Sequence, residues 1–130
     1  MSDLVSQKVN MIFKSPKGKG ETVHALKDIS FTLKKGELLT VLGPSGCGKT
    51  TLLNIAAGFL RPTSGSMNLG GKEINGPGVE RGMVFQQGAL FEWLTVNKNV
   101  NFGLRMKKED PIKTAKKVEE WLEIVGLQGF

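Results

Sequence analysis

Hydrophobic and polar positions alternate along the first third of the chain, a pattern that predicts short, half-buried strands. The alternating hydrophobic positions are Val9, Met11 and Phe13 in the first run and Ile29, Phe31 and Leu33 in the second. A further short strand is expected to begin near Val23, after a loop over residues 14–21 that contains Pro16, Gly18 and Gly20. Strands spaced this closely indicate an antiparallel layer.

A continuous hydrophobic run replaces the alternation at residues 38–42, after a predicted tight turn at Lys34-Lys35-Gly36. Such a run is typical of a strand that is buried on both faces of a parallel sheet. A second, shorter run at residues 83–85 predicts another core strand, ending at Gln86. Between them, Met67, Leu69 and Ile74 predict a short hairpin around Gly70-Gly71.

Helical periodicity dominates the remainder of the pattern. Residues 49–57 are expected to form a helix that ends at Gly58, and Thr95 can cap a second helix. Asp110 and Pro111 form a strong start signal for a third helix, because Asp is a good N-cap and Pro suits the first helical position. The predicted buried faces are Val96, Val100 and Leu104 in the second helix, and Ile112, Ala115, Val118, Leu122 and Val125 in the third, before Gly126.

The segment between the buried run and the first helix matches the phosphate-binding pattern G-x-x-x-x-G-K-[ST] at every required position. Its residues, with the threonine that follows, are Gly43, Pro44, Ser45, Gly46, Cys47, Gly48, Lys49, Thr50 and Thr51. A glycine-rich loop that leads into a helix N-terminus aims backbone N–H groups and partial positive charge at an anion. Lys49 is expected to reach the β and γ phosphates, and Thr50 is expected to supply one oxygen to a Mg²⁺ shell.

Composition narrows the class of protein. A chain of 130 residues with 39% hydrophobic content is ordinary for a globular domain, and no leader-peptide pattern or membrane-length hydrophobic run is visible. These features predict a cytoplasmic location.

The net charge of +6 would suit a protein that binds nucleic acid or anionic lipid. A solvated surface is the favoured interpretation, and no nucleic-acid partner is expected, because the cations are scattered and lack interleaved aromatic side chains. The single Cys47 occupies an unrestricted position of the motif.

These motifs resemble the nucleotide-binding subunits of ABC transporters. The similarity rests on residues 25–30, Gly36-Glu37, the phosphate-loop motif, residues 62–65 and residues 83–86. Residues 77–82, 84–86, 93–96 and 99–100 are similar to those of importers for nitrate, sulfonates or taurine. The resemblance implies an α/β P-loop NTPase core with an antiparallel β layer over residues 1–94, and the incomplete start of a helical subdomain over residues 95–130.

The resemblance also implies roles outside the phosphate loop. Gln86 matches the glutamine with which the family contacts Mg²⁺ and the attacking water. Phe13 stands near the position of an aromatic residue that stacks on adenine, although a strand-core role is an equal alternative. Trp93 is either an anchor for the membrane partner or a core residue. His24 is expected to be a surface residue of a strand.

Partners and cofactors follow from the same resemblance. ATP and Mg²⁺ are the implied cofactors. The implied partners are transmembrane permease subunits, a second ATP-binding subunit and, indirectly, a substrate-binding protein. These partners would place the protein peripherally on the inner face of the cell membrane.

The 130 residues contain no LSGGQ segment, no apolar strand ending in Asp-Glu and no switch histidine. We therefore expect an N-terminal fragment that cannot hydrolyse ATP alone. The alternatives are a truncated non-hydrolytic nucleotide-binding module and an ABC-type ATPase outside transport.

Overall fold

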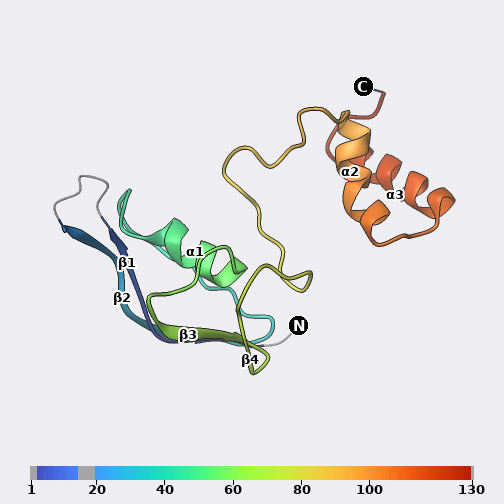
Figure 1. Ribbon diagram of the computed structural model, residues 1–130. Helices are drawn as coiled ribbons and strands as arrows, with labels where there is room; N and C mark the ends of the chain where they lie inside the picture. The colour runs from blue at the N-terminus through green and yellow to red at the C-terminus, as the bar shows by residue number, and fades with distance from the viewer. Residues whose placement is uncertain (1–2, 15–19, 130) are drawn as a thin grey trace. The chain divides into compact units, whose positions relative to one another are not determined.

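The computed structural model describes residues 3–14 and 20–129, which divide into two compact units, Met1–Met83 and Val84–Phe130. The first unit contains a sheet and one helix, and the second contains two helices (Figure 1). Most of the predicted loop over residues 14–21, including Pro16 and Gly18, lies outside the described residues. No helix in the described ranges is long and apolar enough to cross a membrane.

The first unit is built on a four-stranded antiparallel sheet with the order β2-β1-β3-β4. Its strands are β1 (Leu4–Lys14), β2 (Thr22–Leu33), β3 (Ser64–Leu69) and β4 (Lys72–Glu73). The predicted antiparallel layer is therefore confirmed. The two strands expected near Val23 and around Phe31 are one continuous strand, β2. The hairpin around Gly70-Gly71 is also confirmed, because both glycines have the positive φ (58° and 78°) that a two-residue hairpin turn favours.

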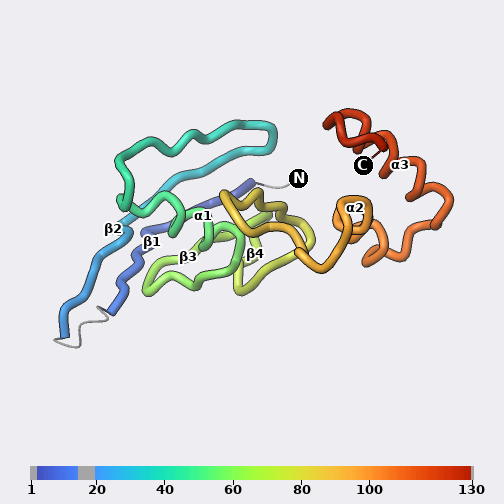
Figure 2. Tube along the Cα trace, turned by 90° about the horizontal axis from the view of Figure 1, so that it is seen from above, coloured from blue at the N-terminus to red at the C-terminus, as the bar shows by residue number. Residues whose placement is uncertain are grey.

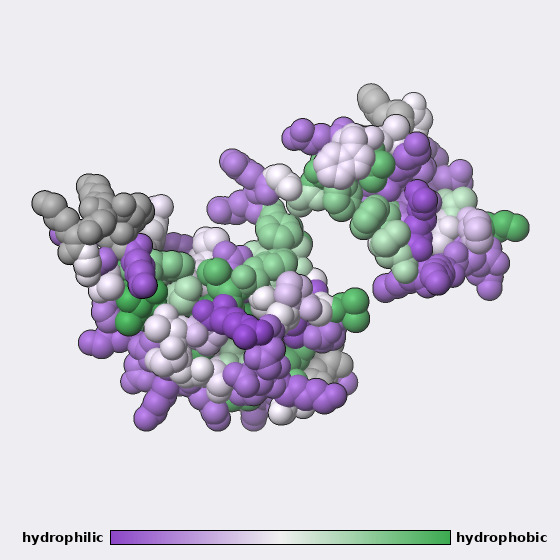
Figure 3. Space-filling model, viewed as in Figure 1, coloured by the Kyte–Doolittle hydropathy of each residue, from purple (hydrophilic) through white to green (hydrophobic). Residues whose placement is uncertain are grey.

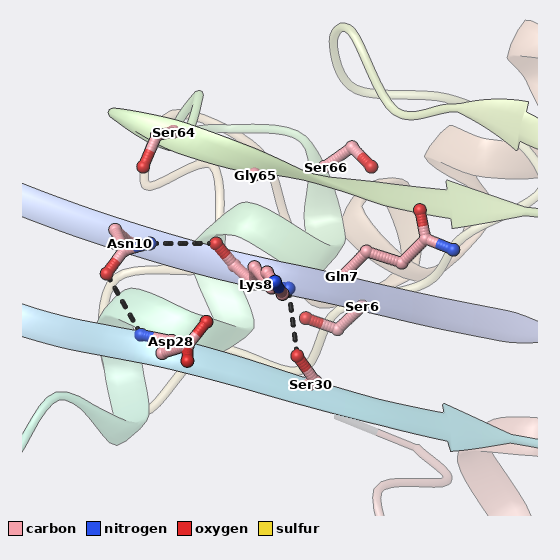
Figure 4. Close-up of a pocket in the computed structure, with 9 residues that line it drawn as sticks. All are labelled: Ser6, Gln7, Lys8, Asn10, Asp28, Ser30, Ser64, Gly65 and Ser66. Atoms are coloured by element: carbon pink, nitrogen blue, oxygen red, sulfur yellow. Dashed lines mark hydrogen bonds between the residues drawn. The ribbon is translucent and has the colours of Figure 1, made fainter.

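Paired irregularities bend β1 against β2, where Lys8 and Asp28 both have positive φ values (46° and 52°). The Asn10 side chain joins them, since its amide nitrogen donates to the Lys8 carbonyl (2.8 Å) and its oxygen accepts from the Asp28 N–H (2.9 Å). The Ser30 hydroxyl accepts from the Lys8 N–H (2.9 Å). Figure 4 shows these contacts in a polar trough on the sheet. The Asn10–Asp28 and Lys8–Ser30 hydrogen bonds join β1 to β2 at this bend.

Helix α1 (Lys49–Ala57) covers one face of this sheet and completes the core of the first unit (Figure 1). Leu52 and Ile55 of α1 are buried against hydrophobic side chains of the sheet and of the segment after β4. The buried core residues are Val9, Met11, Leu26, Leu52, Ile55, Met67 and Ile74. The predicted helix bounds are confirmed, because glycines with positive φ stand at both ends, Gly48 and Gly58.

The two predicted core strands at residues 38–42 and 83–85 do not form, and this prediction is wrong for the described structure. Leu38 and Leu42 are 91% and 86% exposed, and Val84 is 98% exposed. A strand of a parallel sheet depends on backbone hydrogen bonds to neighbouring strands. No strand in residues 3–14 and 20–129 pairs with either segment. Hydrophobic side chains of both segments are therefore exposed. Figure 3 shows hydrophobic residues at the surface of the first unit.

The second unit pairs α2 (Val96–Met106) with α3 (Pro111–Ile124). Both predicted caps are confirmed, since the Thr95 hydroxyl accepts from the Lys98 N–H and the Asp110 carboxylate accepts from the Ile112 N–H. The buried core is Leu104, Val118 and Leu122, with Val100 packed against it.

The predicted buried stripe on α3 is only partly correct. Its buried residues are Thr114, Val118 and Leu122, whereas Ile112, Ala115 and Val125 are exposed, because α2 contacts α3 along a narrower line than the hydrophobic pattern suggests.

Asn99 fastens the segment before α2 to the helix. Its oxygen accepts from the Phe91 N–H (2.8 Å), and its amide nitrogen lies 3.1 Å from the carbonyl oxygens of Phe91, Leu94 and Thr95. The Phe91 ring, held by this contact, packs against Phe102 with ring centroids 4.5 Å apart. Trp93 contacts Phe91 but is 79% exposed, so its interpretation as a core residue is wrong.

Substituting Asn99→Ala is expected to destabilise the second unit by about 1–3 kcal/mol, because it leaves the Phe91 N–H and several carbonyl groups without their side-chain partner. Chemical denaturation followed by Trp fluorescence measures this effect. Asn97→Ala is the matched control, because Asn97 is an exposed residue of the same helix. Equal midpoints for the two variants would show that the Asn99 contacts contribute nothing.

Candidate functional site

The phosphate-loop motif lies where the chain returns from β2 to the start of α1. A hydrogen bond from the Glu37 N–H to the Lys34 carbonyl (3.1 Å) closes the turn at residues 34–37. After this turn the chain runs back beside β2 (Figure 2). The loop turns again between Pro44 and Cys47, where the Cys47 N–H donates to the Pro44 carbonyl (3.4 Å). This path brings Gly48 to the N-cap position of α1.

Gly48 is the N-cap of α1, and its conformation requires a glycine. Its φ is 99°, and a Cβ built there would lie 2.4 Å from the Ala25 carbonyl oxygen and 2.9 Å from the Leu26 side chain. Leu26 belongs to the core that also contains Leu52 and Ile55. The loop is therefore seated directly on β2 and shares the core of the first unit.

The N-terminus of α1 is open to an anion. No side chain caps it, and its first turn contains no acidic residue. The Leu52 N–H makes the first intrahelical hydrogen bond to the Gly48 carbonyl (2.9 Å), which leaves the earlier N–H groups of the turn pointing out of the helix end. An uncapped helix start with the partial positive charge of the helix dipole favours phosphate oxygens.

The Lys49 ammonium lies across the loop. Its Nζ donates to the carbonyl oxygens of Gly43 (2.8 Å) and Pro44 (2.7 Å), and lies 3.6 Å from the Cys47 Sγ. These contacts hold a positive charge beside the backbone N–H groups that the loop and helix present. A phosphate group in the loop would therefore meet both the helix start and the lysine.

The other side chains of the motif are placed around this turn. Cys47 is exposed, and Thr50 is exposed in the first turn of α1. Among the described residues, no group of three His, Cys, Asp or Glu side chains could hold a metal ion. The residues present still fit Mg²⁺ bound together with a nucleotide, because this ion keeps several waters and takes most other ligands from phosphates. Thr50 would supply the one protein oxygen.

The other two predicted site residues lie apart in sequence from the loop. Gln86 is an exposed residue of the second unit, outside any helix or strand. Phe13 pairs with Val23 near the end of β1, is 38% exposed and does not belong to the core. The strand-core interpretation of Phe13 is therefore wrong, and its adenine-stacking role stays a prediction. His24 is an exposed residue of β2, as expected.

Sequence reasoning missed the seat of the loop on β2. Ala25 and Leu26 make the closest approach to Gly48, although they precede it by more than 20 residues. The only signal for them was that they open the segment of residues 25–30 on which the family resemblance rests. Hydrophobic alternation alone marks Leu26 as buried without saying what it supports.

Comparison with known sequences identifies the relatives of this chain. The sequence profile described as "ABC transporter" matches residues 26–130. The chain is 85% identical over all 130 residues to the taurine import ATP-binding protein TauB of Pelagibacter ubique (strain HTCC1062), and covers 48% of that protein. It is 52% identical over 105 residues to the protein of the same name from Escherichia coli (strain K12), with 81% of this chain and 41% of the relative covered. The chain thus spans about half the length of these relatives.

The fold also matches solved structures. One is a dimeric, post-hydrolysis state of the ATP-binding cassette MJ0796 bound to ADP and Pi, with a TM-score of 0.80 and 28% sequence identity. The match covers 97% of this chain and 58% of the cassette. A second dimeric structure of MJ0796, a bacterial ABC transporter cassette, gives a TM-score of 0.81 at the same identity. The α/β P-loop NTPase type of fold expected from the sequence is confirmed for the part that the chain covers.

Proposed function

Because this chain belongs to the ABC transporter family, we propose that it is the ATP-binding part of an importer's ATPase subunit and that its phosphate loop binds Mg-ATP. The observation that carries the proposal is the geometry around Gly48 and Lys49. An uncapped helix start lies beside an ammonium group that is held within 2.8 Å of two loop carbonyls. Both features favour a polyphosphate.

In this proposal each residue of the loop has a separate task. The backbone N–H groups of residues 46–50 surround the phosphates, and the glycines permit the close approach of backbone and ligand. Lys49 exchanges the carbonyls of Gly43 and Pro44 for phosphate oxygens when nucleotide enters. Thr50, together with the phosphates, would hold Mg²⁺, which would supply positive charge to the β and γ groups.

Two further roles are proposed on the family resemblance. Gln86 would contact Mg²⁺ and the attacking water. Phe13 stacks on the adenine ring, for which its exposed face near the end of β1 is suitable.

Hydrolysis and transport are proposed for the longer protein of which relatives are known, because the chain covers less than half of those proteins. The partners there would be transmembrane permease subunits, a second copy of the ATP-binding subunit and a substrate-binding protein. The location would be peripheral, on the cytoplasmic face of the membrane. The names of the relatives favour taurine as the imported substrate, within the class of small anions that also includes other sulfonates and nitrate.

Reconstitution tests the transport proposal. The full-length protein that contains this chain, assembled with its permease in lipid vesicles, is expected to hydrolyse ATP severalfold faster when a taurine-loaded binding protein is added. Nitrate and an alkanesulfonate serve as alternative substrates in the same assay. Stimulation by one of these and not by taurine would correct the substrate, whereas no stimulation by any of them would refute an importer for small anions.

A further inference from the structure

The turn between α2 and α3 gathers more positive charge than any comparable segment of the second unit. We call residues 105–117 the basic turn. It contains six cations and two acids, and all six cations are exposed. The cations are Arg105, Lys107, Lys108, Lys113, Lys116 and Lys117.

The two acids of the basic turn are already engaged. The Glu109 carboxylate pairs with the Lys117 ammonium (3.1 Å). The Asp110 carboxylate caps α3 by accepting from the N–H groups of Ile112 (2.8 Å) and Lys113 (3.4 Å). Within the described ranges, none of the other five cations forms an ion pair. Their charge is therefore available to a partner.

The distribution of charge on α3 does not serve the stability of the helix. Lys113, Lys116 and Lys117 occupy its first two turns, and Glu119, Glu120 and Glu123 follow them. Its first turn has no acidic residue and its last turn has no basic residue. Apart from the Asp110 N-cap, this polarity is the reverse of what the helix dipole favours, because acids stabilise the N-terminus and cations the C-terminus. A role outside the helix explains the basic end better.

Two large hydrophobic side chains lie among these cations. Met106 ends α2 and is 63% exposed, and Ile112 lies in the first turn of α3 and is 83% exposed. Figure 3 shows hydrophilic residues over much of the second unit, with hydrophobic residues also at its surface. Exposed hydrophobic residues beside clustered cations are typical of surfaces that lie at the boundary between lipid headgroups and acyl chains.

We propose that the basic turn docks on a membrane surface that contains anionic phospholipid. Its unpaired cations complement the negative surface potential of such a membrane, and Met106 and Ile112 enter the headgroup region. Nucleic acid is the less suitable polyanion, because the basic turn contains no aromatic side chain on which a base could stack. The proposal is independent of nucleotide binding and adds a direct lipid contact to any contact with protein partners.

Vesicle sedimentation with the 130-residue chain tests this proposal. The chain is expected to bind vesicles of phosphatidylcholine mixed with phosphatidylglycerol, and not vesicles of phosphatidylcholine alone. The combined substitutions Lys107→Gln, Lys113→Gln and Lys116→Gln are expected to weaken binding by about tenfold or more, since each cation near an anionic surface contributes substantially. The matched control, with Lys27→Gln, Lys34→Gln and Lys72→Gln, has the same net charge but should lose about twofold at most, because these exposed lysines lie outside the basic turn.

A second pair of variants tests whether the basic turn binds a membrane surface or a soluble polyanion. Ile112→Gln is expected to weaken vesicle binding severalfold, whereas Val79→Gln, which alters a fully exposed hydrophobic residue of the first unit, should leave it unchanged. Circular dichroism is used to check that each variant is folded. The proposal would be overturned if the two lysine triples lost vesicle binding equally, or if the basic-turn triple bound as well as the unaltered chain. It would also be overturned if Ile112→Gln and Val79→Gln bound vesicles equally, or if the chain bound duplex DNA in place of anionic vesicles.

Discussion

Replacing Lys49 with alanine is expected to lower the affinity of the chain for Mg-ATP by about a hundredfold. The ammonium group now donates to the carbonyls of Gly43 and Pro44 and would transfer these hydrogen bonds to phosphate oxygens. A hydrogen bond to a charged group contributes about 1.5–3 kcal/mol, and the loss of about 3 kcal/mol corresponds to roughly two orders of magnitude in Kd. Titration calorimetry with Mg-ATP measures the change.

The control for this substitution is Lys72→Ala, which removes an equal charge from an exposed position on β4. It should bind Mg-ATP as the unaltered chain does. If Lys49→Ala kept the unaltered affinity, the phosphate-loop assignment would be wrong. Equal losses in both variants would reduce the role of Lys49 to general electrostatic attraction.

Replacing Gly48 with alanine is expected to destabilise the first unit by about 2–5 kcal/mol. The left-handed conformation at φ 99° disfavours a side chain by about 1–2 kcal/mol. The new Cβ would also lie 2.4 Å from the Ala25 carbonyl oxygen, and such overpacking adds roughly 1–3 kcal/mol. Since the loop cannot move from β2 without moving α1, Mg-ATP affinity should fall together with stability. Urea denaturation followed by circular dichroism measures the first effect.

Gly46→Ala is the matched control, because it separates strain from overpacking within the same loop. Gly46 also has a positive φ (80°), but a Cβ there would meet no atom within 4 Å. Its substitution should therefore cost only the conformational term, about 1–2 kcal/mol. Identical denaturation midpoints for the two variants would contradict the seating of the loop on β2.

Features that depend on neighbouring residues in the sequence were predictable. Helix α1 was predicted with its correct bounds, since the glycines at both ends and the hydrophobic spacing between them lie within one short segment. The cap of α3 by Asp110 was predicted for the same reason. The phosphate-loop motif is equally local, so the residues that hold the proposed nucleotide could be named from the sequence.

Features that depend on distant segments were not predictable. The hydrophobic run at residues 38–42 predicted a buried strand, yet whether it pairs depends on strands that the described residues do not supply. On α3, Thr114 is buried and Ile112 is exposed, because contact with α2 decides which face is covered. Similarly, nothing near Gly48 in the sequence shows that Ala25 lies against it. In each case the missing information was the identity of the contacting segment.

The most direct test of the central claim is an equilibrium titration of the unaltered 130-residue chain with Mg-ATP. Binding of one nucleotide per chain, with a saturable signal that ADP displaces and AMP does not, is the predicted result, because the loop recognises a polyphosphate at the start of α1. Hydrolysis should not accompany binding, since the 130 residues contain neither the family's LSGGQ segment nor its apolar strand ending in Asp-Glu. Absence of saturable binding by a folded chain, or binding that AMP displaces as well as ATP does, would contradict the account.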